Sequence, residues 1–493
     1  MLHIKYNFIF FLFIINHLIY GQNNHFIKIK DNKFYLGEQI FYSLGTNAYF
    51  LHSLSCKDDT NLIRELFEYV KSLNMNTIRI WAFSEGERKN IFTLHYGPYN
   101  YNEESFVKLD YVLYTGSKYN IKFILTLCNN WDDFGGIKQY LNWFASRENK
   151  TVIEEQKINV IRSQINKNNI FDYNIFDNIF HDDFFLKDTI KNWYKAYVKY
   201  LLNRKNFYTG LEYKNDTSIM AFELINEPES SDRTGKIIYK WLSEMSIFFK
   251  SIDTNHLLTT GETGFDVSNI SYGKYPEWLL DGSKGISFKM NSSIRFIDYT
   301  TAHLYSDVWN NLSGSEWIYD HKIISDNYNK PFLLSEFGSK QNRRLYFSSW
   351  LTAIKKIRAG GALLWQMVPQ SFVDDDGYAL KIGINSEELN LIRYYFSLIQ
   401  QEDKEELLAN GENNVYPNPS SSEIYLNINM ESNSEVEYEV YDLLGKICLN
   451  EKRVMNRGNN VVLINVRNYS SGVYFLKIMY ERKVIIKKFV VIK

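Results

Sequence analysis

Strand-like and helix-like segments alternate through residues 25–400 of this chain, and this order constrains its fold more than any other feature. Apolar runs with the length of buried strands are separated by stretches with helical periodicity. The expected strands lie at 42–47, 76–81, 121–127, 219–225, 256–261, 297–303, 332–336 and 362–366. Eight strands with interleaved helices predict an α/β fold, a (β/α)8 TIM barrel with insertions.

The helical segments expected between these strands include 61–73, 106–118, 188–202, 235–249 and 343–358. A doubly wound open sheet would show the same alternation of strands and helices. That fold is typically marked by a Gly-rich phosphate loop after an early strand, and the sequence has none at those positions. The barrel is therefore the preferred prediction for residues 25–400.

Residues 1–21 have the features of a secretory signal peptide. Lys5 supplies a positive flank, Phe8–Ile15 is an unbroken apolar run, and Gly21 is a small residue at the expected cleavage point. A buried N-terminal strand is the alternative interpretation. No later stretch approaches the ~18 consecutive apolar residues of a transmembrane helix, so we expect no membrane span in the mature chain.

The residue composition and the pattern of apolar residues change in the C-terminal part of the chain. Residues 401–415 are polar and charged, which is typical of a linker. After them, short runs of alternating apolar and polar residues predict a small antiparallel β-sandwich over 416–493. This region resembles the C-terminal sorting domain of the type IX secretion system in Val415-Tyr-Pro-Asn-Pro, Ser471-Gly-Val-Tyr and the terminal Lys-Lys-Phe-Val-Val.

The resemblance to the sorting domain implies that the secretion machinery is a partner and that the chain is secreted or held at the cell surface. An ordinary β-sandwich, such as a carbohydrate-binding module, is the alternative. The charge balance, with 56 basic and 57 acidic side chains, argues against a nucleic-acid partner. The only cysteines are Cys56, Cys128 and Cys448, too few and too widely spaced for a disulfide framework or a zinc ribbon.

Polar and aromatic residues concentrate where the expected strands end, whereas the strand interiors are aliphatic. In a barrel, these ends and the loops that follow them carry the chemistry. The positions concerned are Asn47, Arg79, Trp81, Asn129, Trp131, Asn226, Glu227, Glu262, His303, Tyr305, Glu336 and Trp365. In a barrel with a purely structural role, this concentration of polar and aromatic residues at the strand ends would not be expected.

Two glutamates stand out in this set. Glu227 and Glu336 each end an apolar strand segment, where an ionised carboxylate is costly unless it has a partner. Paired carboxylates suit the cleavage of glycosidic bonds, because one donates a proton to the leaving oxygen while the other attacks or activates water. Taken alone, Glu227 could instead be an acid at a helix N-terminus, since Pro228 suits the first helical position.

Several motifs spread over about residues 40–395 resemble glycoside hydrolase family 5, and its endo-β-1,4-mannanases most closely. They are Thr77-Ile-Arg-Ile-Trp-Ala-Phe, Leu127-Cys-Asn-Asn-Trp-Asp-Asp-Phe-Gly-Gly, Glu223-Leu-Ile-Asn-Glu-Pro, Ala302-His-Leu-Tyr, Leu334-Ser-Glu-Phe-Gly-Ser and Leu364-Trp-Gln. The resemblance implies a β-mannan substrate and hydrolysis with retention of configuration. It implies no metal and no organic cofactor, because two carboxylates suffice.

Carried over by position, the resemblance implies that Glu227 is the general acid/base and Glu336 the nucleophile. Arg79 and Tyr305 would hydrogen-bond the nucleophile and keep it ionised, while Glu227 would hold a proton in a partly apolar setting near His303. The remaining residues are expected to contact the sugar: Asn226 at the 2-OH, Trp365 as the floor beneath the reacting ring, Trp131 and Trp81 as further platforms, and Asn129 in the loop after the third strand.

The sequence departs from the family pattern directly after Asn226-Glu-Pro, where these mannanases commonly carry Arg and this chain has Glu229. This puts the subsites for the leaving group, and any transglycosylation, in question. The Asp374-Asp-Asp-Gly run lacks the alternating ligands of a calcium loop and is interpreted as a solvated loop. An endo-β-1,4-glucanase of the same family and a non-catalytic polysaccharide-binding protein are the alternative functions.

Overall fold

The computed structural model of the chain describes residues 26–152, 179–267, 275–305, 314–373, 376–410, 415–416, 418–481 and 483–492. The predicted signal peptide over residues 1–21 lies outside the described residues. The chain divides into two compact units, the first reaching Ser397, apart from Glu38–Ile40, and the second beginning at Leu398.

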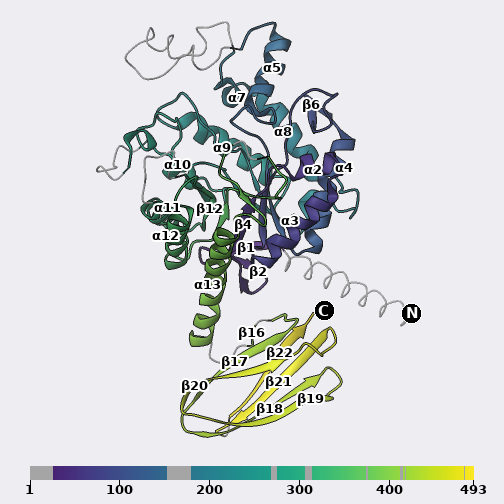
Figure 1. Ribbon diagram of the computed structural model, residues 1–493, viewed down its shortest axis with the longest axis vertical. Helices are drawn as coiled ribbons and strands as arrows, with labels where there is room; N and C mark the ends of the chain where they lie inside the picture. The colour runs from purple at the N-terminus through teal and green to yellow at the C-terminus, as the bar shows by residue number, and fades with distance from the viewer. Residues whose placement is uncertain are drawn as a thin grey trace, which may run out of the picture. The chain divides into compact units, whose positions relative to one another are not determined.

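Eight parallel strands form the central sheet of the first unit, with helices around it (Figure 1). Their order in the sheet is β10-β9-β8-β5-β4-β13-β12-β11, as expected of a barrel in which consecutive strands are neighbours. The bounds are β4 (Ser43–Asn47), β5 (Thr77–Trp81), β8 (Lys122–Thr126), β9 (Ile219–Glu223), β10 (Leu257–Thr259), β11 (Thr300–Tyr305), β12 (Phe332–Gly338) and β13 (Gly361–Leu364).

Each of these strands overlaps one of the eight predicted segments, so the predicted TIM barrel is confirmed. The two end strands of the sheet, β10 and β11, are brought together by backbone hydrogen bonds. Asp298 N donates to Leu258 O at 2.8 Å, and His303 N donates to Thr263 O at 3.0 Å. These bonds close the sheet, and every residue of β4, β5, β9, β10, β12 and β13 is buried.

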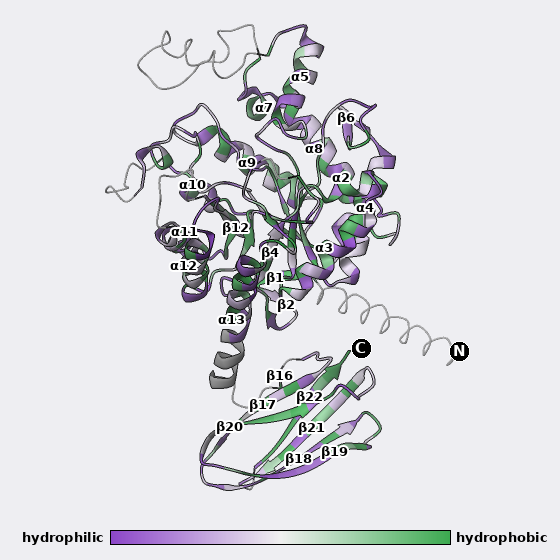
Figure 2. Cartoon of the chain, in the orientation of Figure 1, coloured by the Kyte–Doolittle hydropathy of each residue, from purple (hydrophilic) through white to green (hydrophobic). Residues whose placement is uncertain are grey.

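The helices of the first unit lie outside the strands (Figure 1). They are α2 (Leu51–Cys56), α3 (Thr60–Ser72), α4 (Glu103–Lys118), α5 (Gly136–Glu148), α7 (Asp183–Leu186), α8 (Asp188–Asn203), α9 (Lys236–Lys250), α10 (Phe288–Ser292), α11 (Ser315–Asn327), α12 (Arg343–Lys356) and the first part of α13 (Ser386–Asn410), whose residues from Leu398 belong to the second unit. In α3 the buried residues are Ile63, Leu66, Phe67 and Val70, the spacing of one helix face turned to a core. Figure 2 shows the corresponding hydrophobic and hydrophilic sides of the outer helices.

Short elements complete the first unit. The antiparallel strands β1 (Ile27–Lys30) and β2 (Lys33–Leu36) precede the barrel strands, and β3 (Gln39–Ile40) lies in the segment that the division leaves outside this unit. The pairs β6 (His95–Gly97) with β7 (Asn100–Tyr101) and β14 (Met367–Val368) with β15 (Leu380–Lys381) lie in loops, as do the 3-10 turns η2 (Tyr213–Asn215) and η3 (Glu277–Leu279). No helix among the described residues is long and apolar enough to span a bilayer.

The second unit contains two antiparallel sheets packed over an apolar core, as predicted for the C-terminal region. One sheet has the order β16-β17-β20 and the other β19-β18-β21-β22. The bounds are β16 (Val415–Tyr416), β17 (Glu423–Met430), β18 (Ser434–Asp442), β19 (Ile447–Met455), β20 (Gly458–Asn465), β21 (Gly472–Tyr480) and β22 (Lys483–Val491). The core between the sheets includes Ile424, Val440, Ile464 and Phe489.

Helix α13 continues to Asn410, so residues 401–410 of the predicted linker are helical. Their sequence is rich in Glu and Leu, which are good helix formers. The polar composition that suggested a linker is therefore equally that of a solvated helix.

Candidate active site

The predicted site residues come from the carboxyl ends of six barrel strands, where a TIM barrel carries its chemistry. A cleft of about 610 Å³ opens there. Eight of the ten predicted residues line it: Trp81, Asn129, Trp131, Asn226, Glu227, Tyr305, Glu336 and Trp365. The other two, Arg79 and His303, are fully buried beneath it and contact its carboxylates.

Glu336 lies on β12 and is held by two donors from neighbouring strands. Arg79 Nη1 donates to Glu336 Oε1 at 2.6 Å, and the Tyr305 hydroxyl donates to Oε2. His303 Nδ1 lies 3.4 Å from the same Oε2. A carboxylate oriented by a guanidinium and a phenol has a fixed direction, which a nucleophile requires.

A second carboxylate, that of Glu223 at the end of β9, also binds the Arg79 guanidinium. Arg79 Nε donates to Glu223 Oε1 and Oε2 at 3.1 and 3.0 Å, and Nη2 also donates to Oε1. Both side chains are fully buried. Thr126 Oγ1 donates to Glu223 Oε1 at 2.9 Å, and Asn47 Oδ1 accepts from Arg79 Nη1 at 3.0 Å. The contacts with Glu223 and Asn47 therefore hold the guanidinium in the orientation in which it donates to Glu336.

Glu227 follows β9 in the left-handed backbone region, with φ of 47°. Its amide donates to Gly261 O at 2.8 Å, which helps hold a conformation that costs a non-glycine residue about 1 kcal/mol or more. Trp131 Nε1 donates to Oε2 at 2.7 Å, and His303 Nδ1 lies 2.5 Å from Oε1. The carboxylate is thereby turned into the cleft that it lines.

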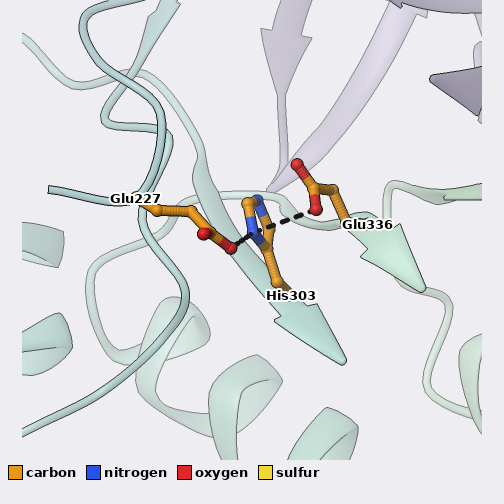
Figure 3. Close-up of side chains that lie close together, drawn as sticks. All are labelled: Glu227, His303 and Glu336. Atoms are coloured by element: carbon orange, nitrogen blue, oxygen red, sulfur yellow. Dashed lines mark hydrogen bonds and ion pairs between the residues drawn. The ribbon is translucent and has the colours of Figure 1, made fainter. Parts of the chain in front are cut away.

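His303 lies between the two glutamates (Figure 3). One carboxylate oxygen from each glutamate and a ring nitrogen of His303 all lie within 4.8 Å of one another. Retaining glycosidases place their carboxyl groups about 5–5.5 Å apart, whereas inverting enzymes need about 6.5–9.5 Å to admit a water. The spacing at this site therefore matches retention.

The electrostatics of the free site follow from these contacts. Burial raises the pKa of Glu336, and the charges of His303 and Arg79 offset this only in part. Burial acts in the same direction on Glu227, but the hydrogen bonds from His303 and Trp131 outweigh it and leave the pKa of Glu227 lowered. Burial lowers the pKa of His303, and the two carboxylates more than compensate, so the pKa of His303 is raised.

These directions differ from the sequence expectation, in which Glu227 holds a proton and Glu336 is ionised. The difference arises because His303 and Trp131 both contact Glu227 in the free site, and hydrogen bonds to a carboxylate favour its charged form. The contact with Trp131 could not be read from the sequence. Because His303 contacts both carboxylates, the three groups titrate as one cluster.

This cluster is also the one grouping of carboxylates and histidine in the described residues with the spacing of a metal site. The positive charge that a metal ion would bring to this cluster is, however, already supplied by the Arg79 guanidinium, which is bound to Glu336. His303 Nδ1 is likewise engaged with Glu227. The donor set is therefore better suited to proton transfer than to holding a cation.

Aromatic rings form one wall of the cleft. Tyr49 stacks against Trp365, with ring centroids 5.6 Å apart and planes at 17°, and against Trp81 at 6.1 Å and 29°. The Trp365 indole Nε1 donates to Asp376 Oδ2 at 2.9 Å, while Asp376 Oδ1 accepts from Tyr378 N at 2.9 Å. Asp376 lines the cleft, so this part of the run interpreted as a solvated loop orients an aromatic platform.

Asn226 and Asn129 are coupled to each other and to the arginine. Asn226 Oδ1 accepts from Arg79 Nη2 at 2.7 Å, and its Nδ2 donates to Asn129 Oδ1 at 3.0 Å. Glu262, which also follows a strand, does not line the cleft. It is buried beside Thr260 and Asn291, and burial raises its pKa to about 8.

Comparison with known proteins identifies the family. The model of the GH family 5 beta-mannosidase-like domain matches residues 24–357. The chain belongs to glycoside hydrolase family 5. The barrel and the two carboxylates at the ends of its strands are the features expected of a member of this family. Residues 414–493 match the secretion system C-terminal sorting domain, so the chain is exported to the cell surface or the medium.

Individual relatives match almost three quarters of the chain. Mannan endo-1,4-beta-mannosidase 4 of Solanum lycopersicum is 32% identical over 383 residues, covering 72% of this chain and 87% of that protein. Mannan endo-1,4-beta-mannosidase 7 of Arabidopsis thaliana is 32% identical over 392 residues, covering 74% and 84%. The solved structure of the endo-1,4-beta-D-mannanase from Thermotoga petrophila RKU-1 aligns with a TM-score of 0.62 and 31% identity over 73% of this chain and all of that one.

Proposed function

We propose that this glycoside hydrolase is a mannan endo-1,4-β-mannosidase, which hydrolyses internal β-1,4 bonds of mannans, glucomannans or galactomannans with retention of configuration. The observation that carries the proposal is the pair of carboxylates at the ends of β9 and β12, with oxygens within 4.8 Å of each other in a cleft walled by aromatic rings. Relatives that are 31–32% identical over 72–74% of this chain bear this activity in their names.

In the first step, Glu336 attacks the anomeric carbon and forms a glycosyl-enzyme bond as the glycosidic C–O bond breaks. Glu227 gives its proton to the leaving oxygen. That proton comes from His303, whose raised pKa favours the imidazolium and whose Nδ1 lies 2.5 Å from Glu227 Oε1. Its transfer leaves a neutral imidazole and a protonated Glu227.

In the second step, Glu227 acts as a base and takes a proton from water, and the water oxygen displaces Glu336 from the anomeric carbon. Two inversions give net retention. The leaving carboxylate regains the hydrogen bonds from Arg79 and Tyr305, which stabilise the charge that returns to it.

Substrate contacts follow from the lining of the cleft. Trp365 stacks on an apolar sugar face, with Trp81 and Trp131 as further platforms along the chain of sugars. The amide of Asn226 has two hydrogens, and one is used by Asn129, which leaves the other for the sugar 2-OH. Because Arg79 fixes the opposite end of this amide, its direction is set before substrate binds.

For the rest of the chain, we propose a signal peptide over 1–21, a catalytic domain over 25–400 and a sorting domain over 416–493 that engages the type IX secretion machinery. The two-unit division of the structure and the match of the sorting-domain family support this organisation.

The activity is tested by reducing-sugar release and viscosity loss on linear mannan and on soluble cellulose. Wild type is expected to cut mannan faster than cellulose, with viscosity falling early because internal bonds break. Glu336→Gln and Glu227→Gln remove one ionisable group each with little change of shape, and Glu65→Gln on the exposed face of α3 is the matched control.

Each alternative has its own outcome in this experiment. Faster turnover of cellulose than of mannan would assign the chain to the endo-β-1,4-glucanases. Binding of mannan without release of reducing ends would make it a polysaccharide-binding protein. Full activity of Glu336→Gln would show that another group is the nucleophile.

A further inference from the structure

Glu85, in the loop that follows β5, is a buried carboxyl in contact with the turn of residues 129–136 (the Trp131 turn). Glu85 is only 5% exposed. Its Oε2 accepts from Gly136 N at 3.1 Å, and its amide donates to Phe134 O at 2.8 Å. Among the described residues, Glu85 Oε1 has no hydrogen-bond partner. Because burying a carboxyl is costly, its place against this turn needs an explanation.

The contact with Gly136 lies at the start of helix α5. Gly135, the residue before this helix, has no side chain that could accept from the first helical amides. Glu85 Oε2 accepts from the amide of Gly136 instead, and Asn129 O accepts from Ile137 N at 2.8 Å. The first amides of a helix have no partner within the helix, so an acceptor from outside stabilises its start. Glu85 supplies that acceptor from a different loop.

The Trp131 turn has a backbone that depends on such support. Phe134, Gly135 and Gly136 are consecutive residues in the left-handed region, with φ of 59°, 100° and 53°. A Cβ atom on Gly136 would lie 2.4 Å from Trp131 O, so the backbone at Gly136 packs directly against that of Trp131. Sparsely populated conformations persist only where the surrounding structure holds them. The contacts of Glu85 with both ends of this run hold it in place.

The Trp131 turn carries two residues that contact the proposed catalytic machinery. Trp131 Nε1 donates to Glu227 Oε2 at 2.7 Å, and Asn129 Oδ1 accepts from Asn226 Nδ2 at 3.0 Å. Trp131 is 43% exposed, so packing around the ring does not by itself fix the indole. The backbone from which the indole projects must therefore set its direction.

The surroundings of Glu85 favour a neutral carboxyl. Burial raises the pKa of Glu85 well above its usual range, and the hydrogen bond from Gly136 N offsets this only in part. The titratable groups that face Glu85 are themselves neutral, because burial raises the pKa of each of them: Cys128 after β8, Tyr140 on α5, and Tyr194 and Tyr197 on α8. Gly136 N thus donates to the oxygen of a neutral group, a role that a glutamine can also fill.

We propose that Glu85 is a positioning residue for the acid/base Glu227, because by holding the start of α5 it sets the place from which the Trp131 indole donates. Glu85 is not among the residues that line the cleft, and it acts through the Trp131 turn. The inference rests on the proposed function, since that function gives Glu227 its role.

The test is the pH profile of kcat/KM on mannopentaose, whose basic limb reports the loss of the proton that Glu227 delivers. Glu85→Met keeps the length of the side chain and removes the acceptor, whereas Glu85→Gln keeps a carbonyl oxygen for Gly136 N. Glu85→Ala removes the acceptor with a smaller side chain and is measured beside Glu85→Met, with near-UV circular dichroism to establish the fold. Glu87→Met, in the same loop, is the exposed control.

In Glu85→Met and Glu85→Ala the basic limb is expected to move up by about 0.5 pH unit, because a weaker hydrogen bond from Trp131 raises the pKa of Glu227. The maximal kcat/KM should fall about fivefold, since the acid is less well oriented. Glu85→Gln should restore the limb to within about 0.2 unit of wild type. Once Trp131→Phe has removed the indole N–H, adding Glu85→Met should move the limb no further.

A folded Glu85→Met or Glu85→Ala whose basic limb stays with that of wild type would overturn the proposal, because a loss of stability alone does not move the limb. The same movement of the limb with and without the Trp131 indole N–H would also overturn it, as would a Glu85→Gln that behaves like Glu85→Met. A wild type that is inactive on mannopentaose would instead overturn the proposed function.

Discussion

The hydrogen bond from Trp131 to Glu227 makes a specific prediction about the pH dependence of catalysis. Trp131→Phe keeps the aromatic ring and removes the indole N–H that donates to Glu227 Oε2 at 2.7 Å. Hydrogen bonds to the charged form of a carboxylate lower its pKa, and this one is among the causes that hold the pKa of Glu227 low. Without it, the pKa of Glu227 rises.

The magnitude follows from the exposure of the donor. Hydrogen bonds to charged groups are worth about 1.5–3 kcal/mol, but Trp131 is 43% exposed, so water replaces part of the lost bond. We take about 1 kcal/mol, which at about 1.36 kcal/mol per pKa unit raises the pKa of Glu227 by about 0.7.

The assay is the pH profile of kcat/KM on a soluble manno-oligosaccharide, because this profile reports the acid and base of the free enzyme. The basic limb reports the loss of the proton shared by Glu227 and His303. A higher pKa keeps that proton to higher pH, so the basic limb of Trp131→Phe moves up by about 0.7. Trp81→Phe is the matched control, since the described hydrogen bonds place no contact between Trp81 and Glu227. A limb that moves down, or that moves equally in both variants, would refute the reasoning.

Three further outcomes follow from the same contacts. Glu223→Gln leaves Glu336 as a charged partner of the buried Arg79 but removes the second carboxylate, and we expect a loss of about 1.5–3 kcal/mol in the free energy of unfolding, measured in urea. Tyr305→Phe removes a donor to Glu336, the proposed nucleophile, and kcat should fall about 10²-fold or more in steady-state assays with the fold intact by circular dichroism. Asp376→Asn weakens the anchor of the Trp365 indole, and kcat/KM on mannan should fall about tenfold with the melting temperature unchanged within 2–4 °C.

The barrel could be predicted because its strands are short apolar runs buried on both faces, and these differ clearly from the amphipathic helices between them. The clustering of the site residues could be predicted in the same way, since the carboxyl ends of parallel strands meet at one face of a barrel. The helical continuation of α13 was missed because a polar sequence rich in Glu and Leu fits a solvated helix as well as a linker.

The residues missed at the site share a physical reason: their roles depend on contacts made across the barrel. Glu223 ends a strand in the same motif as Glu227, but only the structure shows that it faces Arg79. Asp376 belongs to an acidic run without a ligand pattern, and only the structure shows that the Trp365 indole donates to its carboxylate. Lys284 carries no motif at all, and its pairing with Glu229 depends on a loop whose close packing requires Gly285.

The central claim is that Glu336 forms the bond to the sugar while Glu227 supplies and removes the proton. The most direct measurement uses 2-deoxy-2-fluoro-β-mannobiosyl fluoride, which forms the glycosyl-enzyme faster than water can release it, followed by peptide mass mapping. The account predicts a single added glycosyl group on the peptide that contains Glu336, and none in Glu336→Gln. A label on Glu227 or any other residue, or turnover of the reagent with inverted product and no label, would contradict it.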